Sequence, residues 1–263
     1  MIDFENIKQW FPEPLQQKNY ARFILREYLQ YLILDFLSNS KYASQLNFIG
    51  GTSLRLFHGI DRFSEDIDFD HKELDAITFI EMTDRIVRFI QKSGFNVMAD
   101  DKEKDKTLKA YRRNLVFPGL LFENQLSPFR DEKFLIKIES QDQGVNYTPE
   151  VRLIKGCGHI FNFQTPTPEV ICAMKISTLL SRKKGRDFYD SMFLLSRTSP
   201  DYSFLEQSSG IRNDIQLKQQ LLDLIGTINL KHKARDFEHL LISREQSNKI
   251  LLFPDFIRSR FPG

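Results

Sequence analysis

The sequence predicts an α+β fold, in which a core of mixed strands and helices is followed by a part made of helices alone. An amphipathic helix pattern covers residues 18–37, strand and helix patterns alternate between residues 46 and 163, and only helix patterns come after that. The change falls near residue 165. We therefore predict a core domain at residues 1–165, including the N-terminal helix, and a helical C-terminal domain at residues 166–263.

The composition indicates a folded protein with a large core. The 263 residues are 41% hydrophobic and 27% charged, and the formal net charge is only +2. These values exclude a disordered chain and a polyelectrolyte. The two cysteines exclude a disulfide framework and favour a reducing, cytoplasmic setting. We expect no membrane association, because no secretory signal opens the chain and charged residues interrupt its most apolar helix.

The first predicted elements lead to a glycine turn. The helix at residues 18–37 has apolar residues at three-and-four spacing, and Ser38-Asn39-Ser40 ends it. A short strand at residues 46–49 runs into Gly50-Gly51, which permits a turn with positive φ, and a short helix follows at residues 52–57. Residues 64–70 alternate acidic and apolar side chains, which predicts a strand with one buried face.

The same patterns continue along the rest of the chain. A helix ended by Gly94 is predicted at residues 75–93, and the strongest central strand is predicted at residues 134–139. Thr167-Pro168-Glu169 is a helix start with a capping hydroxyl, and Gly185 is the predicted end of that helix. The other predictions are a solvated loop or hairpin tip at 100–109, strands at 151–154 and 159–163, and helices at 186–196 and 214–233.

Two short motifs carry the chemistry. Gly50-Gly51-Thr52-Ser53 at a helix start offers backbone N–H groups and hydroxyls to a phosphate chain. Asp66 and Asp68, two residues apart on a strand, point to one side and can bind a divalent cation together. Each motif alone is common in turns or solvated strands. Their combination, about a dozen residues apart, favours in-line attack at phosphorus, which needs both devices.

These motifs resemble the AbiEii/AbiGii-type toxin family of nucleotidyltransferase-like proteins in the DNA polymerase β superfamily. The resemblance rests on the segments 48–54 and 62–69 and on a second signature, in which Lys175 precedes Arg186-Asp187-Phe188-Tyr189-Asp190. It implies a polymerase-β-type nucleotidyltransferase core with a mixed sheet. It also implies transfer of a nucleotide from an NTP to an acceptor such as RNA or tRNA, with Mg²⁺ or Mn²⁺ as the metal and a cognate antitoxin as partner.

The resemblance also implies roles for the residues of the first motifs. Gly50, Gly51, Thr52 and Ser53 would hold the triphosphate, and Asp66 and Asp68 would hold Mg²⁺. The superfamily supplies a third carboxylate from a neighbouring strand, and Glu139 is the best candidate, with Asp142 second. Glu139 would complete the metal site or activate the attacking hydroxyl. The alternative is an exposed acid at the end of a strand, paired with Lys137.

Five further positions have more than one interpretation. Lys175 would reach the triphosphate, and the alternative is a solvated lysine on a helix. Asp187 or Asp190 would be functional, and the alternative for these two and Arg186 is an internal ion-pair network. Arg62 would bind the triphosphate or form a structural salt bridge. Ser64 would approach the phosphate, accept one, or cap a local turn.

The acceptor is the least determined part of the prediction. Basic clusters at Arg112-Arg113, at 182–186 and at 231–235 suit either an RNA surface or plain solvated helix ends. Three rival functions share parts of the same site. They are a small-molecule (antibiotic-type) nucleotidyltransferase, a two-metal nuclease and a non-catalytic nucleotide-binding module.

Overall fold

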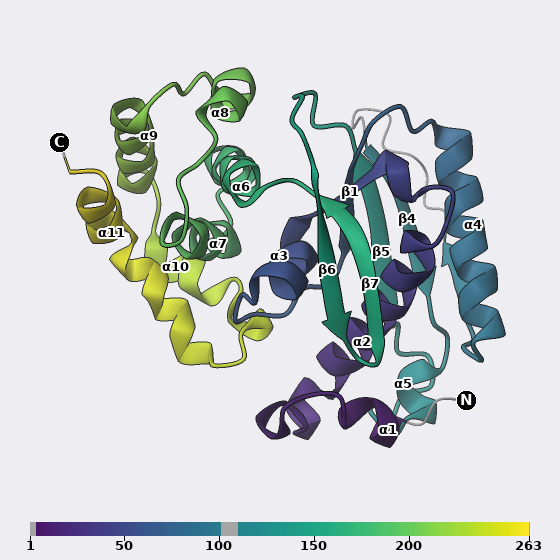
Figure 1. Cartoon of the computed structure of the whole chain (residues 1–263). Helices are drawn as coiled ribbons and strands as arrows, with labels where there is room; N and C mark the ends of the chain where they lie inside the picture. Colours follow the sequence, from purple (N-terminus) through teal and green to yellow (C-terminus); the bar gives the residue numbers. More distant parts are fainter. Residues whose placement is uncertain (1–3, 101–109, 263) are drawn as a thin grey trace. The chain divides into compact units, whose positions relative to one another are not determined.

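A computed structural model describes residues 4–100 and 110–262 (Figure 1). The loop predicted at residues 100–109 lies, except for Asp100, outside the described residues. The chain divides into two compact units. The first contains the described parts of Met1–Gly59, Phe63–Gln143 and Val151–Thr165, and the second contains Ile60–Arg62, Gly144–Glu150 and the described part of Pro166–Gly263.

A five-stranded mixed sheet organises the first unit, in the order β1-β2-β5-β4-β3. The antiparallel pair β1 and β2 is joined to β5 by a parallel pairing, and β4 and β3 follow in antiparallel order. The α+β prediction is therefore confirmed, and β5 is the central strand. The strands are β1 (Leu46–Ile49), β2 (Ile67–His71), β3 (Met98–Asp100), β4 (Ala110–Val116) and β5 (Leu135–Gln141).

Helices and a separate two-stranded sheet accompany these strands. In the first unit the described α-helices are α1 (Phe4–Lys8), α2 (Ala21–Ser38), α3 (Gly50–His58), α4 (Ala76–Lys92) and α5 (Leu120–Glu123). Short 3-10 turns lie at Glu13–Leu15, Lys18–Tyr20 and Ala43–Gln45. The two-stranded sheet pairs β6 (Glu150–Gly156) with β7 (His159–Thr165). In Figure 1, α4 runs along the sheet. It contacts β3, β4 and α2, and Asp75 caps its first turn by accepting a hydrogen bond from the Thr78 amide at 2.7 Å.

An aromatic cluster joins β7 to the main sheet. The rings of Phe48, Phe69 and Phe163 have centroids 5.9, 6.0 and 5.8 Å apart, and all three side chains are buried. Contacts of this kind combine apolar burial with favourable ring geometry. The Thr165 hydroxyl also donates to the carbonyl of Phe48 at 2.9 Å. The cluster therefore fixes the end of β1, from which the glycine turn begins.

The described part of the second unit is mainly helical. Its helices are α6 (Pro168–Arg182), α7 (Gly185–Leu195), α8 (Tyr202–Ser209), α9 (Asp214–Gly226), α10 (Leu230–Arg235) and α11 (Phe253–Arg260), with 3-10 segments at Glu238–Leu240 and Arg244–Leu252. Among the helices within residues 4–100 and 110–262, none has the length and apolar character that a membrane span needs.

Two helix boundaries differ from the prediction in this unit. Helix α6 ends at Arg182 because Lys183 adopts a left-handed conformation, and Gly185 begins α7 instead of ending α6. A Cβ atom on Gly185 would lie 1.8 Å from the carbonyl oxygen of Lys233, so close packing explains this glycine. The predicted helix at 214–233 is broken after Gly226, and Asn229 caps a new helix.

Candidate functional site

Four strands of the sheet carry a row of facing residues in the first unit. The pairing aligns Ile49 with Asp68, Asp68 with Glu139, and Glu139 with Arg112. Aligned residues on neighbouring strands project to the same side of a sheet. The acids on β2 and β5 and the arginine on β4 therefore share one face, beside the start of α3.

The glycine turn and the second aspartate of the motif are in direct contact. Gly50 has φ +84°, and a Cβ atom there would lie 2.1 Å from Oδ2 of Asp68. Only glycine fits both the conformation and the space. The contact brings a carboxylate against the first turn of α3, where backbone N–H groups lack helical partners. The glycine turn and Asp68 are therefore adjacent.

A hydrogen-bond chain holds the loop that carries Asp66. The Thr52 hydroxyl is fully buried and donates to the carbonyl of Asp66. Gln30 on α2 is also buried, and its amide donates to the Thr52 hydroxyl at 3.4 Å and to the carbonyl of Ser64 at 3.1 Å. Thr52 therefore fixes the site loop. Its neighbour Ser53 has a buried hydroxyl with no hydrogen-bond partner within residues 4–100 and 110–262.

The ammonium group of Lys137 lies between the acids. Its Nζ is 3.1 Å from Oδ2 of Asp66 and 3.2 Å from Oε2 of Glu139. Burial alone would lower the pKa of Lys137, but the fields of Asp66, Glu139 and Asp68 outweigh it and raise this pKa above its ordinary value. Lys137 therefore stays charged and links the two acidic strands. The predicted pairing of Lys137 with Glu139 is confirmed.

Glu139 is held by a second cation. Nε of Arg112 lies 2.7 Å from Oε2 of Glu139, and the second guanidinium nitrogen is 3.2 Å from Oε1. Burial alone would raise the pKa of Glu139, but the hydrogen bond from Arg112 and the charge of Lys137 outweigh it and lower this pKa. A carboxylate with a lowered pKa is a poor proton acceptor. Its geometry therefore favours a charge partner over a general base.

The donor set fits a divalent cation on the aspartates. Within the described residues, no three or more His, Cys, Asp or Glu side chains form a group that could hold a metal ion. Asp66, Asp68 and Glu139 are thus not brought together as a three-carboxylate set. The carboxylates of Asp66 and Asp68 still suit a Mg²⁺ ion, because Mg²⁺ is commonly bound by one or two carboxylates together with substrate phosphates and water.

The second unit contains a buried ion cluster of its own. The guanidinium of Arg62 contacts both carboxylate oxygens of Asp190 at 2.7 Å, and Nζ of Lys175 lies 3.0 Å from Oδ2 of Asp190. Burial alone would raise the pKa of Asp190, but Arg62 and Lys175 outweigh it and hold this pKa well below its ordinary value. Asp187 has another role, since it accepts from the Lys184 amide at 3.0 Å and pairs with Arg182.

Comparison with known proteins decides the family. The model of the AbiEii nucleotidyl transferase toxin family, a type IV toxin–antitoxin system, matches residues 32–252. The chain belongs to this family. It is therefore a nucleotidyltransferase of a toxin–antitoxin system, and the family implies an NTP substrate and a cognate antitoxin.

Solved structures support the same fold at low sequence identity. JHP933 from Helicobacter pylori is 18% identical, with a TM-score of 0.55 and coverage of 91% of each chain. The nucleotidyltransferase toxin MenT4 from Mycobacterium tuberculosis is 16% identical, with a TM-score of 0.58 and coverage of 100% of this chain and 89% of MenT4. A search of curated proteins gave no match.

The AbiEii signature residues are thus divided between the two units. Gly50, Gly51, Ser53, Asp66 and Asp68 gather at the start of α3, while Arg62, Lys175 and Asp190 form the cluster of the second unit. A triphosphate contact for Lys175 remains a prediction. The second candidate for the third acid, Asp142, lies 3.5 Å from Lys72. Sequence reasoning missed Gln30, although a glutamine among apolar helix residues was an available signal.

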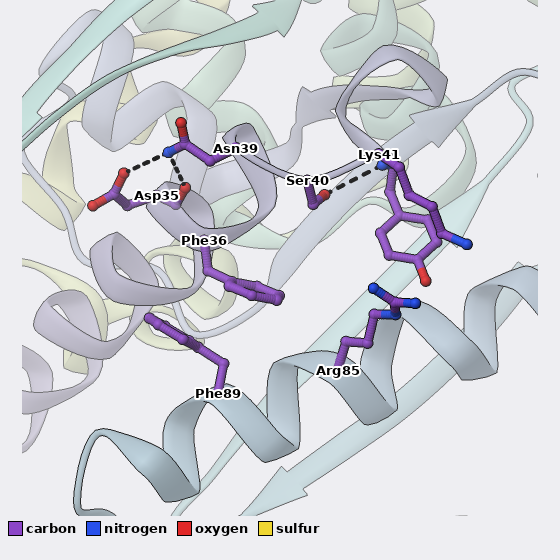
Figure 2. Close-up of a pocket in the computed structure, with 8 residues that line it drawn as sticks. Asp35, Phe36, Asn39, Ser40, Lys41, Arg85 and Phe89 are labelled. Atoms are coloured by element: carbon purple, nitrogen blue, oxygen red, sulfur yellow. Dashed lines mark hydrogen bonds between the residues drawn. The ribbon is translucent and has the colours of Figure 1, made fainter.

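A separate pocket in the first unit does not contain the signature residues. It has a volume of about 490 Å³ and is lined by residues of α2, of the segment after it, and of α4 (Figure 2). The rings of Phe36 and Phe89 stack there with centroids 4.5 Å apart. Its cations Lys41 and Arg85 both pair with Glu81, at 3.2 and 3.0 Å. Both cations are thus already engaged by an acid, so we assign this pocket no ligand.

Proposed function

We propose that this toxin transfers a nucleoside monophosphate from an NTP to a hydroxyl group of RNA, with Mg²⁺ bound at Asp66 and Asp68. The observation that carries the proposal is the contact between Gly50 and Asp68. It brings a phosphate-binding helix start and a metal-binding carboxylate within van der Waals reach of each other. We also propose that the protein acts in the cytoplasm, where NTP and RNA are available, under restraint by its antitoxin.

In the first unit, some residues bind the triphosphate and others position them. The amide groups of Gly50 and Gly51 and the hydroxyl of Ser53 bind phosphate oxygens, and the buried Ser53 hydroxyl lacks a hydrogen-bond partner among the described residues. Thr52 and Gln30 keep the Asp66 loop in register with this helix start. A bound Mg²⁺ ion would offset part of the triphosphate charge and polarise the α-phosphate.

The reaction is a substitution at the α-phosphorus. The acceptor oxygen forms a bond to the α-phosphorus, and the bond from that phosphorus to the bridging oxygen breaks. Pyrophosphate leaves with the bonding electrons, and the hydroxyl proton passes to solvent water. Positioning and electrostatic stabilisation dominate catalysis of phosphoryl-type transfer, and the site supplies both.

A basic surface within the second unit supports RNA as the acceptor. The junction of α6 and α7 exposes Lys183 and Lys184, and α10 exposes Lys231 and Arg235. The two segments are neighbours, because the amide of Gly185 bonds both carboxylate oxygens of Asp236 at 3.0 Å. Clustered lysines and arginines attract phosphate backbones through counterion release. In contrast, Arg112 and Arg113 are engaged with Glu139 and Asp84.

An incorporation assay tests the proposal. The protein is incubated with Mg²⁺ and each α-³²P-labelled NTP, together with total RNA, purified tRNA or no acceptor. We expect label in RNA, and a loss of about 100-fold or more in Asp68→Asn. Asp131→Asn, a change of an exposed acid, serves as the matched control and should retain activity.

The outcomes separate the rival functions. Binding of Mg-NTP without label in any RNA would contradict the RNA acceptor and favour a small-molecule acceptor. Incorporation of label in the absence of Mg²⁺ would contradict the proposed metal dependence. Label on the protein itself would point to Ser64 as acceptor. The double change Lys183→Glu and Lys184→Glu should weaken RNA labelling and its salt dependence without changing NTP affinity, whereas Lys92→Glu should change none of these.

A further inference from the structure

We infer that Lys137 takes the place of a second divalent cation in this site, so that the toxin binds a single Mg²⁺ ion, held by Asp66 and Asp68. The inference rests on the proposed function, because it concerns the metal of the same reaction. It adds a role for a residue that the family signatures described above do not include.

The ammonium group of Lys137 lies between two carboxylates of the site. Lys137 Nζ lies 3.1 Å from Asp66, which directly precedes β2, and 3.2 Å from Glu139 on β5. A second divalent ion that used both carboxylates would need the space between them, where the ammonium group lies. Here the chain supplies that cation itself. Lys137 reaches this space from β5, two residues before Glu139, and therefore from the same face of the sheet.

Two side-chain cations hold Glu139 in place. Arg112 binds this carboxylate through two nitrogens, at 2.7 and 3.2 Å, and Lys137 adds a third contact. Glu139 would have to break all three contacts to become a metal ligand. Bidentate arginine–carboxylate pairs are among the stronger polar contacts in proteins. Glu139 therefore serves as the ion-pair partner of Arg112 and Lys137.

Glu139 already has two fixed cations at one of its oxygens. Nε of Arg112 and Nζ of Lys137 lie 2.7 and 3.2 Å from Oε2 of Glu139. A second divalent ion at this carboxylate would lie beside both cations, and like charges at such distances repel strongly.

Counting bound Mn²⁺ tests the inference with a readout that does not depend on turnover. Mn²⁺ is titrated into the full chain without nucleotide, because a nucleotide would itself bind Mn²⁺, and free Mn²⁺ is followed by electron paramagnetic resonance. We expect one ion per chain in the wild type. Lys137→Met should bind two ions, and its first ion at least about 10-fold more tightly, because the competing charge is removed. Lys137→Arg should still bind one.

Each outcome bears on the inference. Two ions in the wild type, or one ion of unchanged affinity in Lys137→Met, would overturn it, and the first of these needs no variant to fold. Lys92→Met, a change of an exposed lysine on α4, should leave the count at one. Failure of the proposed function is distinguishable, because it would appear as no ion bound to the wild type at all.

Discussion

The contact between Gly50 and Asp68 gives the sharpest prediction, through the variant Gly50→Ala. Gly50 has φ +84°, and a β-carbon in the left-handed region costs about 1–2 kcal/mol. The new methyl group would also lie 2.1 Å from Oδ2 of Asp68, where ordinary contact begins at 3.4 Å. The carboxylate must therefore move by more than an ångström, and a displacement of about 1 Å in a reacting site costs about 100-fold in rate.

The same helix offers a matched control at its other end. Gly59 has φ +67°, but a Cβ atom there meets nothing within 4 Å. Gly59→Ala should thus lose a similar 1–2 kcal/mol in the free energy of unfolding, measured in urea, while keeping its transfer activity and Mn²⁺ affinity. Only Gly50→Ala should lose both, with activity down by about 100-fold.

The comparison of the two variants can refute this reasoning. If Gly50→Ala keeps more than half of the wild-type activity, the contact with Asp68 does not position a reacting group. If Gly59→Ala loses as much activity as Gly50→Ala, the loss reflects backbone strain and not the carboxylate.

Three further predictions concern the supporting structure. Asp190→Asn should lower the free energy of unfolding in urea by about 3–5 kcal/mol, because Arg62 stays buried with a weaker partner, and a loss below about 1 kcal/mol would contradict this. The pKa of Asp190 is lower in the folded than in the unfolded chain, so its contribution is complete above the unfolded value and is lost as the pH falls toward the folded value. Wild-type stability should therefore fall more steeply than that of Asp190→Asn below about pH 4, as followed by urea titrations at several pH values, and parallel curves would contradict the assignment. Gln30→Leu removes the donor to Thr52 and Ser64, which should cost about 1–3 kcal/mol in urea and weaken Mn²⁺ binding, whereas unchanged metal affinity would exclude a positioning role.

Local patterns were enough to predict the part of the fold that carries the aspartates. Strand β1, the glycine turn, α3 and the start of the acidic strand follow from short-range signals, namely alternation, glycine and helix spacing. Strand β4 was missed because Arg112 and Arg113 interrupt its apolar alternation. Their charges are compensated by Glu139 and Asp84, which lie far away in the sequence. A pattern read along the chain contains no information about such partners.

The ion pairs of the site could not be predicted for the same reason, because their partners are distant in the sequence. The sequence left Asp187 and Asp190 as equal candidates. Their environments differ because Asp190 pairs with Lys175 and with Arg62, which lies 128 positions away, whereas Asp187 pairs with Arg182. Lys137 was visible as a neighbour of Glu139 on one strand face. Its approach to Asp66 depends on the parallel pairing of β2 and β5, which no local pattern specifies.

The assignment of Ile60–Arg62 to the second unit has a consequence for synthesis and truncation. Residue 62 leaves the ribosome long before Asp190 and Lys175, so the guanidinium of Arg62 has neither partner while the first unit folds. The tripeptide sits a few residues before Asp66, and its final conformation must wait for the C-terminal helices. A fragment that stops at residue 165 would retain every residue of the sheet and still lack the anchor of this loop. Cutting the chain at its apparent boundary would thus yield an incompletely folded first half.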